Sequence, residues 1–222
     1  MVAKLAEYPA NQLRDLLISD LTGTAIARSG ARDRLRAATH DVHMRLHRHP
    51  SFAQLADGTI DLVSYKSLLA RLYGFHVPLE QALVQASNTL GIDVEMNSRR
   101  RVHLLRDDLI TLQMTEAQIT ALPWSVGLPP LMTCDKLVGA LYVREGATLG
   151  GRVLARRLDG LLGLGSMHGR LFLAGDPGEP RLWQGCCALV EQIAADGHLD
   201  DMIASAINTF VALETWLTKD QP

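Results

Sequence analysis

Apolar residues recur at intervals of three and four along almost the whole chain, which is the spacing of one face of an α-helix. The clearest example is residues 62–90, where one helical stripe contains Val63, Leu68, Leu69, Leu72, Leu79 and Leu83. We find no sustained alternation with a period of two, so the sequence predicts no strand. The pattern therefore predicts an all-α protein of about eight helices that pack as a single compact domain.

Breaks in the helical pattern mark the other predicted elements. Further long helices are expected at about residues 32–47, 98–112, 131–158, 181–195 and 199–217. The proline-rich segment 122–130 and the glycine-rich segment 159–180 are predicted to be irregular. Pro78 is expected to kink or break the helix over residues 62–90. The order Thr-Glu-Ala-Gln at residues 115–118 predicts a capping box at the start of a short helix.

Composition adds limits to this picture. The chain has 222 residues, of which 47% are apolar and 21% charged, as in an ordinary soluble domain. A net charge of -2 gives no reason to expect nucleic acid or an anionic membrane as a partner. No apolar run reaches the roughly 18 residues of a membrane helix, and the N-terminus lacks the order of a signal peptide. We expect a cytoplasmic protein with an N-terminal extension over residues 1–30 and one helical domain over residues 31–222.

The helix predicted over residues 32–47 carries three histidines, His40, His43 and His47. Spacings of three and four place them near one helix face. Two such imidazoles can share a zinc ion, but the HExxH order of zinc proteases is absent, because Met44 and Arg45 stand between His43 and His47. A second interpretation is ordinary exposed and half-buried histidines. A third is one histidine as the axial ligand of haem iron.

The spacing between Arg36 and His43 can be compared with the dimensions of haem. It precedes His43 by seven residues, so the two side chains lie about two turns apart and nearly on the same face. That separation is roughly 10 Å of helix rise, the scale that separates haem iron from its propionate oxygens. One helix can therefore hold the iron and bind a propionate with a bidentate cation.

The helix predicted over residues 131–158 contains three glycines within six positions: Gly146, Gly150 and Gly151. Each costs about 1 kcal/mol of helix stability relative to alanine, so the cluster requires a reason. A helix end, a close crossing with another helix, or a flat ligand lying against the backbone would each supply one. The order is neither that of a P-loop nor that of a dinucleotide-binding turn.

Two stretches taken together resemble the haem oxygenase family. LRAATHDVH (residues 35–43) resembles its proximal helix, in which a threonine stands four residues before the histidine that binds haem iron. ALYVREGATLGGRVL (residues 140–154) resembles its distal helix, where glycines lie over the haem face. These stretches, with those at residues 65–83 and 207–217, look most like the bacterial branch associated with bacteriophytochromes. The resemblance covers nearly the whole chain after residue 30.

The resemblance implies a haem sandwiched between the proximal helix and a glycine-kinked distal helix. Haem b would be both cofactor and substrate, and O2 and electrons would convert it to biliverdin, CO and Fe(II). The matching positions make His43 the iron ligand and Arg36 a propionate-binding residue, with Thr39 at the position of the family's threonine. Gly146, Gly150 and Gly151 become the distal glycines, and Tyr142 and Phe210 become pocket residues.

The resemblance also implies partners. The chain has no flavin, nicotinamide or iron–sulfur motif, so a ferredoxin or a flavoprotein reductase must supply the electrons. The run Arg99-Arg100-Arg101 could dock such an acidic donor, although a charge run is commonly just a solvated face. The bacterial branch adds a bacteriophytochrome as the receiver of biliverdin.

One position departs from the family pattern. Many members carry an aspartate after the first distal glycine, where it orders water near bound O2, and this chain has Ala147 there. A non-catalytic haem-binding protein of the same fold is therefore an alternative. A thiaminase-like helical hydrolase is another, with Cys134 as the candidate nucleophile, although no partner motif accompanies that cysteine. The three cysteines are otherwise expected to be plain buried thiols.

Overall fold

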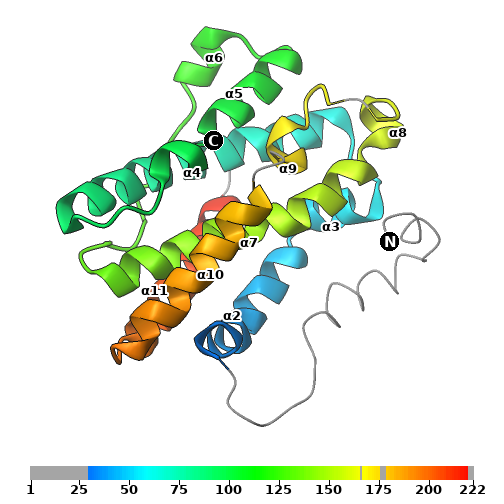
Figure 1. The fold of residues 1–222 in the computed structure, drawn as a ribbon. Coiled ribbons are helices and arrows are strands. Elements are labelled where there is room, and N and C mark those ends of the chain that lie inside the picture. Colours follow the sequence, from blue (N-terminus) through cyan, green and yellow to red (C-terminus); the bar gives the residue numbers. More distant parts are fainter. Residues whose placement is uncertain (1–29, 166, 176–178, 220–222) are drawn as a thin grey trace.

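The computed structural model describes residues 30–165, 167–175 and 179–219 (Figure 1). The helices are α2 (Ala31–His47), α3 (Pro50–Asp57), α4 (Leu62–Leu90), the 3-10 helix η2 (Met96–Arg99), α5 (Val102–Thr111), α6 (Glu116–Thr120), α7 (Cys134–Arg157), α8 (Asp159–Leu162), α9 (Leu171–Ala174), α10 (Glu179–Ala195) and α11 (Leu199–Thr218). No strand occurs among these residues, which confirms the all-α prediction. Residues 1–29 of the predicted N-terminal extension lie outside the described part.

The predicted count of about eight helices is too low. The described residues contain ten α-helices, because three short ones, α3, α8 and α9, were not predicted as helices; α8 and α9 form within the glycine-rich segment 159–180 that was expected to be irregular. At the start of α9, two backbone N–H groups donate to the Asp108 carboxylate. A tertiary contact therefore supports this short helix, which the local sequence does not predict.

The long helix α4 begins and ends at the expected residues. The Asp61 carboxylate accepts from the Ser64 N–H at 2.7 Å, and Gly91 closes the helix in the left-handed region with φ of 66°. The helix runs unbroken through Pro78, so of the two predicted effects of this proline, a kink or a break, the break does not occur. Val63 is 77% exposed, unlike the rest of the predicted stripe, because it lies in the first turn, before α4 enters the core.

Two further predictions concern helix starts. The capping box at Thr115 is confirmed, since the Thr115 hydroxyl and the Gln118 side chain each accept from the other residue's backbone N–H. The helix expected over residues 98–112 is instead divided into η2 and α5. The division falls at Arg100 and Arg101, where the Arg101 N–H donates to the Glu80 carboxylate at 2.8 Å rather than to a helical carbonyl.

Helix α7 lies at the centre of the molecule, between α2, α10 and α11 on one side and α4 and α5 on the other (Figure 1). It packs most extensively on α11, and at Gly139 the two helices approach so closely that a Cβ would overlap the Met202 carbonyl oxygen. The main contacts of α2 are with α11 and α10. Helices α2 and α7 are therefore held on the same two supporting helices. Within the described residues, no helix is long and apolar enough to cross a membrane.

Candidate functional site

His43 lies on the face of α2 that is turned toward α11. Its ring is half-buried and meets the Phe210 ring edge-on, with centroids 5.7 Å apart, and its Nε2 is 3.2 Å from the Nε2 of His47. Burial, followed by the charges of His47, His40 and Arg36, lowers the pKa of His43 to about 4. The imidazole is therefore neutral at pH 7, which is the form that binds a metal ion.

The other α2 residues divide by their surroundings. Arg36 is half-buried, and its positive charge acts to lower the pKa of both His43 and Tyr142. The buried Thr39 hydroxyl donates to the Leu35 carbonyl at 2.9 Å, so it is bonded within its own helix. Among the described residues, no group of three or more His, Cys, Asp or Glu side chains is arranged to hold a metal ion, so the histidines of α2 do not form a three-ligand zinc site.

The three glycines of α7 have different surroundings. A Cβ added at Gly150 would meet nothing within 4 Å, and one at Gly146 would make ordinary contact with Trp183 at 3.6 Å. Their positions, four residues apart, give α7 a bare strip on one face. A Cβ at Gly151 would instead lie 2.8 Å from the Leu173 carbonyl oxygen. Gly151 therefore has a packing reason to be glycine, the close approach of α9, and it does not belong to the bare strip.

An aromatic pair borders this strip. Tyr142, one turn before Gly146, is buried, and its ring centroid lies 5.4 Å from that of Trp183 on α10. Burial raises the pKa of Tyr142 to about 12, so its phenol stays protonated. Trp183 was not predicted from the sequence, because its position beside Gly146 depends on how α10 packs on α7. A tryptophan on an amphipathic helix carries no signal of such a contact.

A buried network of charges lies directly before the first glycine. Glu145 is 2% exposed and pairs with Arg99 at 3.1 Å and with Arg144 at 2.7 Å, and Arg144 reaches Glu80 of α4 at 3.0 Å. Arg99 also donates to the Leu182 carbonyl of α10 at 3.0 Å. The network therefore ties η2, α4, α7 and α10 together at the turn that precedes Gly146, and the Glu145 side chain points into it.

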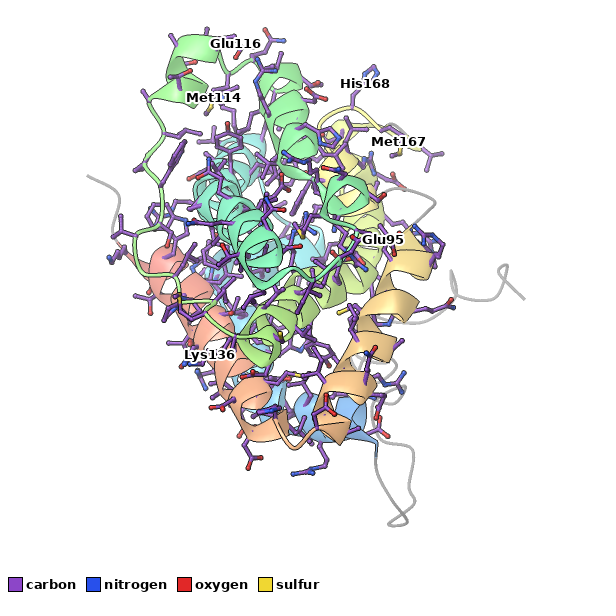
Figure 2. The ribbon with its side chains drawn as sticks, turned by 60° about the vertical axis from the view of Figure 1, so that its left-hand side comes forward. Glu95, Met114, Glu116, Lys136, Met167 and His168 are labelled. Atoms are coloured by element: carbon purple, nitrogen blue, oxygen red, sulfur yellow. The ribbon has the colours of Figure 1, made fainter. Side chains whose placement is uncertain are left out.

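The arginine run at residues 99–101 fits neither possibility given for it, a docking surface for an acidic electron donor or a solvated face, because two of its three members are buried. Arg99 is 1% exposed and Arg101 is 8% exposed, and only Arg100 is at the surface. Arg101 packs over the Phe172 ring, 4.7 Å from its centroid. Glu95, labelled in Figure 2, forms a separate pair at the surface, with the exposed Arg181 at 2.8 Å.

A buried histidine close to the charges of this region, His76, predicts how the stability of the protein depends on pH. His76 is buried beside Phe172, and burial together with the charges of Arg144 and Arg101 lowers its pKa from 6.5 to about 3. Below about pH 6.5 the unfolded chain takes up a proton at His76 that the folded chain does not. We therefore expect this group to cost nothing above pH 6.5 and to lower the free energy of unfolding by about 2 kcal/mol between pH 7 and pH 5.

Urea unfolding at pH 7 and pH 5 measures this effect. The His76→Phe variant lacks the titrating group and should lose about 2 kcal/mol less stability than the parent chain over that interval. Equal losses in the two proteins would show that His76 is already free to bind a proton in the folded state.

The site residues thus form two groups, and the charge of Arg36 acts on one residue of each, His43 and Tyr142. His43 and Phe210 meet on the α2–α11 side, and Tyr142, Trp183 and Gly146 meet on the α7–α10 side. The donor set fits haem: a neutral imidazole for iron, a guanidinium for an acid, and a bare helix strip for a flat ring. By fold and site, the chain is an all-helical protein suited to hold a flat ligand between helices.

Comparisons with known proteins give the family. The family model described as "Heme oxygenase" matches residues 29–219. The "Heme oxygenase" of Xanthomonas campestris pv. campestris (strain 8004) is 30% identical over 168 residues, which cover 75% of this chain and 96% of that protein. The chain therefore belongs to the haem oxygenase family.

Proposed function

We propose that this protein binds haem b and opens the ring with O2 and electrons to give biliverdin, CO and Fe(II). The observation that carries the proposal is His43, an imidazole kept neutral by burial on a helix whose sequence resembles the family's proximal helix. The bare strip at Gly146 and Gly150 supports it, because a Cβ at Gly150 would meet nothing within 4 Å and the Trp183 ring borders the strip only at Gly146. Bound haem supplies both the iron that activates O2 and the ring that is cleaved.

Each of the predicted site residues on the helices has its own role in the proposed reaction. His43 is the iron ligand, and Phe210 holds its ring by edge-on contact. Arg36 binds a propionate, and Tyr142 closes the pocket beside it. Thr39 acts through the helix, since its hydroxyl is already bonded to the Leu35 carbonyl.

On the glycine side of the haem, proton delivery to bound O2 must occur without the aspartate that many family members carry at the position of Ala147. Ala147 is exposed and has no polar group, and the neighbouring Glu145 carboxylate is bonded to Arg99 and Arg144. We therefore assign water ordering to the backbone of α7, where the bare strip leaves its polar groups accessible. The electrons come from a separate ferredoxin or flavoprotein reductase, and the biliverdin passes to a bacteriophytochrome.

Absorption spectra of the protein with one equivalent of haemin test this proposal. A Soret band should form, and after addition of ascorbate or a reductase system in air it should decay while a broad red biliverdin band grows. Ala147 favours one competing function, a haem-binding protein that performs no cleavage. In that case the Soret band would form and persist. No Soret shift would contradict both functions.

Two neighbouring glycines provide a matched pair of variants. Gly150→Ala should stabilise the haem-free protein by about 1 kcal/mol, because its Cβ meets nothing and alanine favours the helix. It should also weaken haem binding by roughly tenfold, because that Cβ projects into the space assigned to haem. Gly151→Ala should affect stability and not haem binding. It should destabilise the protein by about 1–3 kcal/mol through the Leu173 carbonyl and leave the haem Kd nearly unchanged.

Thermal unfolding without haem and a haemin titration measure the two effects separately. The proposal requires that Gly150→Ala weakens haem binding without loss of stability. It also requires that Gly151→Ala loses stability without weaker haem binding. A Gly150→Ala protein that binds haemin as tightly as the parent chain would place the ligand on another face of α7.

A further inference from the structure

We infer that Trp183 contacts the edge of the bound haem ring beside Gly146 and determines which meso carbon is cleaved. The inference rests on the proposed function, because it concerns the orientation of haem in the same site. It adds a specificity-determining residue from α10, a helix that contributes none of the site residues predicted from the sequence.

The position of the indole carries the inference. The edge of its six-membered ring lies 3.6 Å from the point where a Cβ of Gly146 would be, so the indole is packed directly against the first glycine of the bare strip. It does not cover the strip, because the same test at Gly150, one turn later, meets nothing within 4 Å. Trp183 is half-buried. It therefore forms a border at one end of the open strip.

The surroundings of Trp183 connect it to the propionate side of the site. Its ring packs on Tyr142 at 5.4 Å between centroids, and the positive charge of Arg36 acts to lower the pKa of Tyr142. Tyr142, Trp183 and Gly146 thus form a boundary on the α7–α10 side, and Arg36 on α2 acts on it through its charge. A ring whose propionate is bound by Arg36 has one edge against this boundary.

Trp183 is also held in place. The carbonyl of the preceding residue, Leu182, accepts from Arg99 at 3.0 Å, and Arg99 is paired with Glu145 at 3.1 Å. Glu145 directly precedes Gly146 on α7, so a short chain of buried contacts sets the position of α10 relative to the first glycine. Arg99 and Glu145 are positioning residues in this scheme, since they act on the ring only through Trp183 and Gly146.

A fixed aromatic border of this kind affects the choice among similar reaction sites. The four meso carbons of haem are chemically alike, so the carbon that is attacked depends on how the ring is rotated in its plane. A large rigid side chain at one edge opposes rotation past it, whereas a small one permits a second orientation. Trp183 therefore favours one orientation by contact rather than by charge.

The test compares Trp183→Ala and Trp183→Phe with Trp124→Phe as a control. Trp124 is 48% exposed in the loop before α7 and contacts neither glycine of the strip. Two readouts are used: the haem methyl signals in the proton NMR spectrum of the ferric complex, which count ring orientations without turnover, and the ratio of biliverdin isomers after turnover. Trp183→Ala should add a second set of methyl signals and change the isomer ratio by roughly tenfold. Trp183→Phe should show a smaller change, and Trp124→Phe none.

The outcomes separate this inference from the proposed function. If the parent protein turns over haem and both Trp183 variants keep its single orientation and isomer ratio, Trp183 is not the specificity determinant and the proposed function stands. If the parent protein does not bind or cleave haem, the proposed function is wrong and this inference is wrong with it. A change in Trp124→Phe equal to that in Trp183→Ala would also overturn the assignment, because it would not be specific to the border of the strip.

Discussion

Replacing His43 with alanine is expected to remove the histidine-ligated haem spectrum and to reduce biliverdin formation by more than about 100-fold. The reason is local: His43 is the histidine of α2 whose neutral ring contacts Phe210 of α11, so the substitution removes the proposed axial ligand itself. Loss of even an indirect partner of a metal ligand commonly costs 10- to 100-fold, and loss of the ligand itself should cost more. Haemin titration followed by single-turnover spectroscopy measures both effects.

His40→Ala is the matched control. His40 lies on the same helix but is exposed, so its removal should change neither the spectrum nor the rate. Added imidazole should restore the axial-ligand spectrum of His43→Ala, because the substitution leaves a space of the same shape. If His43→Ala keeps the spectrum of the parent protein, the ligand assignment is wrong and His47 becomes the candidate, since its Nε2 is 3.2 Å from that of His43.

Replacing Glu145 with alanine is expected to lower the free energy of unfolding by about 3–5 kcal/mol. The change leaves Arg99 and Arg144, which are 1% and 3% exposed, without their shared carboxylate. An unpaired buried charge is far more costly than the net gain from the pair that it once formed. Chemical denaturation of the haem-free protein measures the loss directly.

Glu95→Ala supplies the comparison for this effect. Glu95 also pairs with an arginine, at 2.8 Å, but both side chains of the Glu95–Arg181 pair are exposed to solvent. An exposed pair of this kind contributes at most about 1 kcal/mol. Similar losses in Glu95→Ala and Glu145→Ala would show that the network before Gly146 is hydrated and does not hold α7 as we describe.

The helices themselves were largely predictable from the sequence. The start of α4 at Asp61, its end at Gly91 and the capping box at Thr115 depend on neighbouring residues only, so their signals are local. The exceptions have tertiary causes. Helix α9 is supported by Asp108, and the break before α5 is supported by Glu80, and both partners are distant in sequence.

The site was predictable on α2 and only partly so on α7. His43 and Arg36 share one helix, so helical spacing alone places them. The glycines of α7 share a motif but not a surrounding, because Gly151 meets α9 while Gly150 meets nothing. Three adjacent arginines gave no sign that two of them are buried, since burial of a charge depends on carboxylates that other helices supply.

The position of iron in crystals of the haemin complex, located by anomalous scattering at the iron edge, tests the central claim most directly. The claim is that haem lies between α2 and α7, with His43 on one face and the Gly146–Gly150 strip on the other. We expect a single iron peak within bonding distance of the His43 Nε2, with the ring between that atom and the strip. An iron peak beside another histidine, such as His49 in the groove next to α3, would contradict it.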